Sequence, residues 1–88
     1  ILTRQFDQIE KKSKEVLMVD STNLIAHNNL AAAYLFQGKY AEAERIYRQY
    51  KSKFKEHFLL ALETFAKAGV IPTERMADVE KIKKMLNE

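Results

Sequence analysis

The stretch NNLAAAYLFQGKYAEAERIY, residues 28–47, joins two segments of opposite character. No residue from 24 to 36 carries a formal charge, whereas charged side chains recur at short intervals after Gly38. Apolar residues at helical spacing predict a helix on each side of Gly38, which suits the turn between them. A helix that is neutral on every side is not a surface helix. The uncharged segment must therefore lie against the rest of the chain or against a partner.

The composition of the whole chain favours an all-α fold in one domain. The 88 residues include two glycines and one proline, and helix-forming Ala, Leu, Lys and Glu are abundant. Fifteen basic and 12 acidic residues give a net charge of +3, which is too small to indicate a nucleic-acid partner by itself. Because cysteine is absent, disulfides, thiolate metal sites and a cysteine nucleophile are excluded.

Two helices flank the opening stretch. The one before it covers residues 5–19 and ends at the turn-forming run DSTN, residues 20–23. The one after Gly38 continues its apolar rhythm to Ala68 without Gly or Pro, and we predict a turn or kink in it at KSK, residues 51–53. The apolar stripe of the first helix consists of Phe6, Ile9, Ser13, Val16 and Leu17.

A last helix closes the chain. Gly69, followed by Val70 and Pro72, fits a left-handed C-cap that ends the preceding helix. The last helix then runs from Thr73 or Glu74 to Leu86, with acidic residues early and lysines late, as the helix dipole favours. Its predicted inner stripe is Met76, Val79, Ile82 and Leu86.

The opening stretch resembles one unit of the tetratricopeptide repeat family. The family places an aromatic residue, Leu, Gly or Ala, and Tyr along one helix, with Ala and an aromatic along the next. In this chain the matching residues are His27, Leu30, Ala31, Tyr34, Ala43 and Tyr47. One repeat length of about 34 residues earlier, Phe6 falls opposite Tyr40 and Val16 opposite Tyr50. The resemblance covers residues 4 to about 50, although His27 replaces the usual bulky apolar residue.

The resemblance implies an α-solenoid fragment built from antiparallel helix pairs. Residues 1–23 would be a half repeat, residues 24–52 a full repeat and residues 53–88 C-terminal capping helices. It also implies a protein interaction or scaffolding module that holds a peptide or partner helix in a concave groove. The residues that would line this groove are Ile25, Asn28, Asn29, Ala32, Leu35 and Phe36. The competing interpretation is that the chain's own C-terminal helices cover this face.

Nucleic-acid binding is the alternative function. Residues 45–55, RIYRQYKSKFK, interleave basic side chains with aromatic ones that could stack on bases. The same aromatics also continue the apolar stripe of Tyr40 and Ala43, which favours a core role. The basic residues are Arg45, Arg48, Lys51, Lys53 and Lys55, and the aromatic ones are Tyr47, Tyr50 and Phe54.

We expect no catalysis, cofactor or metal. His27 and His57 are far apart in sequence and belong to no Glu-x-x-His pair, and we interpret His27 as a core residue. The run DVEK, residues 78–81, is interpreted as a solvated helix face and not as an acid and base pair. No apolar run approaches the roughly 18–20 residues of a membrane span, and the amino end lacks the layout of a signal peptide.

The amino-terminal helix carries a further expectation. Because the chain begins at Ile1, we expect it to be part of a longer protein, with the first helix of a repeat preceding it. Phe6, Ile9 and Val16 would then lack part of their cover, which predicts weak self-association. We expect a soluble protein and favour the cytoplasm as its compartment.

Overall fold

The computed structural model describes the backbone of residues 2–88 and the side chains of residues 5–88. Its described residues form four α-helices, one short 3-10 helix and no strand, so the all-α prediction is confirmed. Within the same residues, no helix is both long and apolar enough to cross a membrane. The elements are α1 (Leu2–Val19), α2 (Leu24–Phe36), α3 (Tyr40–Ala68), η1 (Thr73–Arg75) and α4 (Met76–Leu86).

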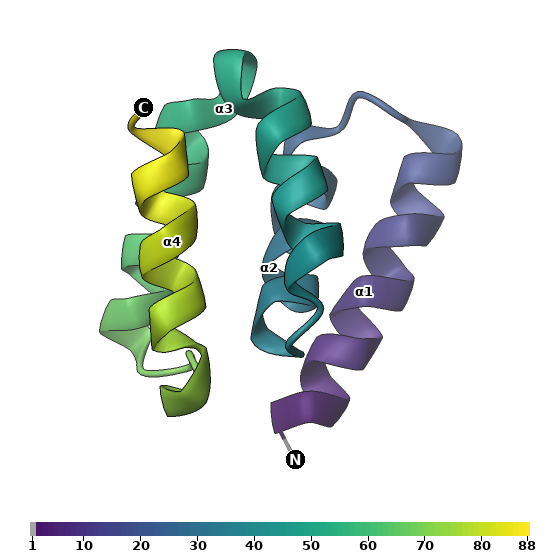
Figure 1. The fold of residues 1–88 in the computed structure, drawn as a ribbon. Helices are drawn as coiled ribbons and strands as arrows, with labels where there is room; N and C mark the ends of the chain where they lie inside the picture. The colour runs from purple at the N-terminus through teal and green to yellow at the C-terminus, as the bar shows by residue number, and fades with distance from the viewer. Residues whose placement is uncertain (1) are drawn as a thin grey trace.

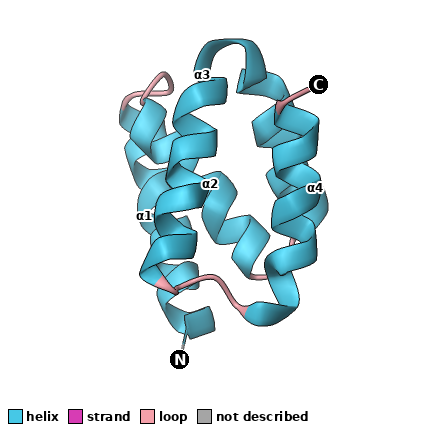
Figure 2. Ribbon diagram, turned by 90° about the vertical axis from the view of Figure 1, so that its left-hand side faces the viewer, coloured by secondary structure: helices cyan, strands magenta, loops and turns pink. Residues whose placement is uncertain are grey.

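Successive segments run antiparallel, because α3 reverses direction near its middle (Figure 1). Phe54 has non-helical backbone angles, φ −122° and ψ 15°, and divides α3 into a first arm, residues 40–53, and a second arm, residues 55–68. The reversal brings Phe65 of the second arm back to Phe36, with ring centroids 5.5 Å apart. After the loop at residues 69–72, α4 returns beside the second arm (Figure 2).

The kink lies at Phe54, just beyond the predicted residues 51–53. Aromatic packing explains the position: the Phe54 ring stacks on Tyr50 at 5.7 Å and meets Phe58 edge-on at 6.0 Å. Such pairs stabilise by about 0.5–1.5 kcal/mol each beyond the area that they bury. The Lys51 ammonium donates a hydrogen bond to the Glu88 carbonyl at 3.0 Å, which ties the kink to the end of the chain.

The remaining helix ends follow local chemistry. Asn23 caps α2, and its side-chain oxygen accepts a hydrogen bond from the Ala26 N–H at 2.9 Å. The C-cap predicted at Gly69 is confirmed: Gly69 has a φ of 71°, and the Val70 N–H bonds to the Phe65 carbonyl. The last helix begins as the 3-10 turn η1 at Thr73 and becomes α-helical at Met76.

The core lies between α2 and the two arms of α3 and is closed by α4. The Tyr47 ring meets the Phe58 ring edge-on at 4.9 Å and links the two arms. Met76, predicted on the inner stripe of the last helix, is 40 % exposed, and this part of the prediction is wrong. Met85 is buried instead, because positions three and four residues after Ile82 share its helix face. The largest fully buried side chains are Tyr47, Phe58, Leu35, Leu62, Ile82, Leu86 and Val79.

Gly38 should tolerate alanine less well than Gly69 does. Both glycines have positive φ, +86° and +71°, so alanine costs about 1–2 kcal/mol of left-handed strain at either position. A Cβ at Gly38 would also lie 2.6 Å from the Arg75 guanidinium, whereas one at Gly69 meets nothing within 4 Å. We therefore expect a larger loss of unfolding free energy for Gly38→Ala than for Gly69→Ala in urea titrations. Equal losses would show that Arg75 moves aside freely.

Candidate binding groove

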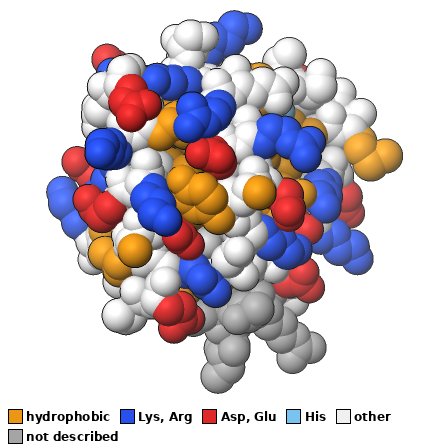
Figure 3. All heavy atoms as spheres, in the orientation of Figure 1, with side chains coloured by type: hydrophobic (Ala, Val, Ile, Leu, Met, Phe, Trp, Pro, Cys, Tyr) orange, Lys and Arg blue, Asp and Glu red, His pale blue; other side chains and the backbone are white. Residues whose placement is uncertain are grey.

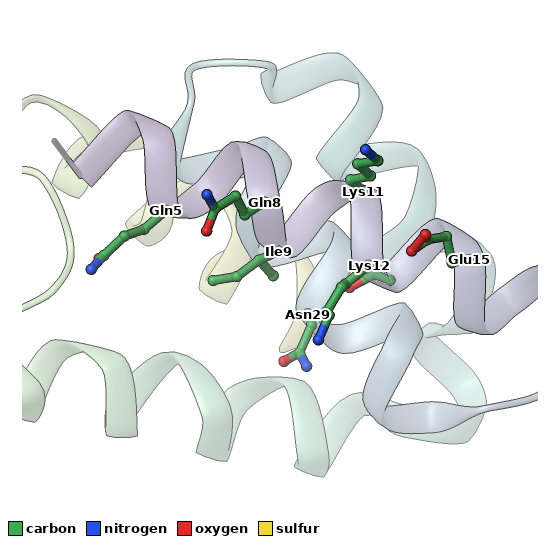
Figure 4. Close-up of a pocket in the computed structure, with 8 residues that line it drawn as sticks. Gln5, Gln8, Ile9, Lys11, Lys12, Glu15 and Asn29 are labelled. Atoms are coloured by element: carbon green, nitrogen blue, oxygen red, sulfur yellow. The ribbon is translucent and has the colours of Figure 1, made fainter.

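A hollow of about 670 Å³ lies along α1. Among the side chains that the structure describes, seven of α1 and Asn29 of α2 line it. Figure 4 shows Gln5, Ile9 and Asn29 directed into the same space, with the second arm of α3 running past its open side. The lining residues are Gln5, Gln8, Ile9, Lys11, Lys12, Ser13, Glu15 and Asn29.

Two smaller hollows adjoin the first, and Asn29 lines all three. One, of about 110 Å³, lies deeper among aromatic residues and reaches Phe65 of the second arm. The other, of about 290 Å³, continues to Val16 and to Ile25 at the start of α2. Because they share Asn29, we treat the three hollows as one feature, the α1–α2 groove.

Three apolar side chains that line the groove are exposed. Ile9 is 39 % exposed, Val16 is 42 % exposed and Ile25 is 69 % exposed. Phe6 is only 5 % exposed, so the expectation that it lacks cover is wrong, because its ring packs against Phe36 at 5.1 Å. Ile9 and Val16 are therefore the exposed apolar residues of α1 that line the groove, and Met18 and Val19, at 87 % and 91 % exposure, lie beyond it at the carboxyl end of the helix.

Three of the predicted partner-binding residues of α2 are buried, and the other three are at least partly accessible. Ile25 and Asn29 line the groove and are accessible from it. Asn28 is half-buried, and its side-chain oxygen has no hydrogen-bond partner within the described part of the chain. The three buried residues are Ala32, Leu35 and Phe36, with exposures of 3 %, 0 % and 4 %.

The burial of these three residues corrects the predicted site. Phe36 is covered by Phe6 of α1 and by Phe65 of the second arm. The chain's own helices thus cover the carboxyl-terminal half of α2, as the competing interpretation proposed, whereas the amino-terminal half stays open. Ala32 and Phe36 touch only the deepest hollow, and Leu35 lines none of the three.

Sequence reasoning missed the contribution of α1. Ile9 and Val16 are partly uncovered, as expected of this stripe from the sequence, whereas Ser13 is buried at 5 % exposure. The spacing of these residues did not indicate that they share a groove with α2. The side chains of Gln5, Gln8 and Lys12 had no pattern that marked them as groove residues.

The opposite side of α1 is held by an ionic cluster. The Glu10 carboxylate accepts hydrogen bonds from Gln37 at 2.9 Å, Lys39 at 3.1 Å and Lys14 at 3.0 Å. The Lys14 and Lys39 ammonium groups also lie 5.5 and 5.6 Å from the centre of the Tyr34 ring. This cluster fixes α1 to the turn between α2 and α3. Lys11, Lys12 and Glu15 of the groove form no ion pair with any described residue.

Glu10 should make the unfolding free energy fall in acid. Burial by itself would raise the pKa of Glu10, but hydrogen bonds from Gln37, Lys14 and Lys39 outweigh it and lower the pKa from 4.5 to about 2. A lowered folded-state pKa gives stability that is present above about 4.5 and lost as the pH falls through about 2. Urea titrations between these values should show a shallower pH dependence for Glu10→Gln than for wild type. Glu63→Gln, which removes an exposed carboxylate, is the control and should leave the slope unchanged.

The aromatic residues of the basic segment at residues 45–55 pack mainly against the protein itself. Tyr47 is fully buried, and Tyr50 and Phe54 are half-buried and stacked on each other. Arg48 pairs with Glu44 at 3.2 Å. On the face shown in Figure 3, which carries the first arm of α3, blue and red side chains are interspersed. These contacts favour the core role of the aromatic residues over base stacking.

The histidines serve no visible metal site. His27 is 7 % exposed, its ring donates a hydrogen bond to the Ser21 carbonyl at 2.7 Å, and it lies 4.1 Å from the Tyr50 ring. His57 is exposed on the second arm. Among residues 5–88, no three His, Cys, Asp or Glu side chains come close enough to hold a metal ion.

Comparison with known proteins adds no relative. No family model, no curated protein and no solved structure matches this chain.

Proposed function

We propose that the protein is an interaction module that holds a partner polypeptide in the α1–α2 groove. The observation that carries the proposal is the exposure of Ile9, Val16 and Ile25 along one concave surface. Exposed apolar residues that gather in a hollow are typical of interaction sites. Asn29 lies among them and offers both a donor and an acceptor to a bound chain.

A tetratricopeptide-like arrangement is part of this proposal. Its support is local: Ala31, Ala43 and Tyr47, which occupy pattern positions of the family, are all 0 % exposed. The helix pair of α2 and the first arm would be the full repeat of residues 24–52, and α1 the half repeat of residues 1–23. The second arm and α4, within residues 53–88, would be the capping helices.

Selection from a phage-displayed random peptide library tests the proposal. The wild-type protein is expected to enrich binding peptides, and the double variant Ile9→Arg/Ile25→Arg is expected to bind them at least about tenfold more weakly, a loss of about 1.4 kcal/mol. Both side chains are exposed, so the melting temperature should change little.

Leu60→Arg is the matched control. Leu60 is 63 % exposed on the second arm and lines none of the three hollows. The Leu60→Arg variant should retain full affinity for the selected peptides. Failure to enrich any peptide, or equal losses in the groove variant and in the control, would overturn the proposed function.

A further inference from the structure

The surface of the groove also indicates what kind of partner it takes. We propose that the occupant is an amphipathic α-helix that lies along α1, with one apolar stripe and with acidic residues beside Lys11 and Lys12. This inference rests on the proposed function and narrows it.

The shape of the lining favours a helix. Six of the residues that line the groove lie on α1 at steps of three or four, so they form one continuous helix face. This face runs from residue 5 to residue 16, a rise of about 16 Å at 1.5 Å per residue, which is roughly three helical turns. The six residues are Gln5, Gln8, Ile9, Lys12, Ser13 and Val16.

The surface shape of this α1 face also favours a helical partner. Ser13 is small and buried, and it lies between the larger, partly exposed Ile9 and Val16. A small residue between two larger ones leaves a depression into which a side chain of a second helix can insert. Apolar residues at i, i+3 or i+4, and i+7 of the partner would fill this depression and cover Ile9 and Val16.

An extended peptide fits this surface less well. Strand addition needs the free backbone groups of a sheet edge, whereas the walls of this groove are helices with internally bonded backbones. Polyproline segments dock on exposed aromatic rings. The aromatic residues that line the groove are Phe6, at 5 % exposure, Phe36, at 4 %, and the half-buried Phe65.

The charge of the groove lining indicates that the bound helix carries acidic side chains. The charged residues that line the groove are Lys11, Lys12 and Glu15, a net charge of +1. Lys14, the next lysine of α1, is already paired with Glu10. Because Lys11 and Lys12 are exposed and unpaired within the described residues, acidic side chains on the partner would gain the most from pairing there.

A library of helix-stabilised peptides, cross-linked between positions i and i+4 and randomised elsewhere, provides the test. Selected peptides are expected to carry apolar residues at i, i+3 or i+4, and i+7 and a net negative charge. Circular dichroism should show that they are helical when bound. The double variant Lys11→Glu/Lys12→Glu should weaken their binding about tenfold at 150 mM salt and less at 500 mM salt. Arg45→Glu/Lys53→Glu, the same charge change outside the groove, should weaken it less than about twofold.

The two libraries together distinguish failure of the helical acidic partner from failure of the interaction module itself. Peptides that depend on Ile9 and Ile25 but are basic, or bind as extended chains, overturn the helical acidic partner and leave the interaction module standing. Failure of both libraries to yield a ligand overturns both. Sedimentation supplies the remaining outcome: a wild-type dimer that becomes monomeric in Ile9→Arg/Ile25→Arg would make a second copy of this chain the occupant.

Discussion

Replacing Ile82 with aspartate is expected to destabilise the fold by at least about 3 kcal/mol, because an unpaired carboxylate enters an apolar core. Ile82 is 0 % exposed and lies on the buried face of α4 with Val79 and Leu86. The introduced carboxylate would lie among the apolar residues of the core cluster, none of which carries a positive charge. Urea titration followed by circular dichroism measures the loss, which is expected to appear as a large fall in the midpoint.

Ala77→Asp is the control for this variant. Ala77 is exposed in the first turn of α4, where a carboxylate is favoured by the helix dipole. It should change the unfolding free energy by no more than about 0.5 kcal/mol. If residues 73–88 can be deleted without loss of melting temperature, α4 does not close the core, and the expectation for Ile82 fails with it.

Truncating Phe36 to alanine is expected to cost about 3–5 kcal/mol, the range for a buried aromatic residue. Phe36 is 4 % exposed, and its ring lies between those of Phe6 and Phe65, at 5.1 and 5.5 Å. The variant therefore removes the contact at which α1, α2 and the second arm of α3 meet. Thermal and urea unfolding measure the loss.

Leu60→Ala, which truncates an exposed side chain of the second arm, is the control and should be nearly neutral. A loss of peptide binding without a loss of stability would contradict this expectation. If Phe36→Ala keeps its melting temperature but loses the selected peptides, the carboxyl-terminal half of α2 is an open groove surface, and its burial between Phe6 and Phe65 is not maintained in solution.

The helices could be predicted from the sequence because their ends are marked locally. Asn23 and Gly69 carry caps that follow from residue type, and the charge-free α2 had to be covered on most sides. The kink at Phe54 could not be located in the same way. No Gly or Pro marks it, and what stabilises it is the packing of Tyr50, Phe54 and Phe58 in three dimensions.

The groove was predictable only in part for the same reason. Periodicity placed Ile25 and Asn29 on the face of α2 that lines it, but it also placed Leu35 and Phe36 there. Phe36 is covered partly by Phe65 of the second arm, and the direction of that arm depends on the backbone angles at Phe54. The incomplete cover of Ile9 and Val16 was expected, but the spacing of α1 alone could not show that these residues share a groove with Ile25 and Asn29.

The reversal at Phe54 has a consequence for how this chain can change in length. Since α3 turns back at one residue and no loop intervenes, the arms on either side keep a fixed rotational phase. Inserting one residue there would rotate the second arm by about 100° about its axis, since a helix has about 3.6 residues per turn. Phe58 and Leu62 would then point away from the core. An insertion in the loop at residues 69–72 leaves that phase untouched, so natural length variation should accumulate there and be absent beside Phe54.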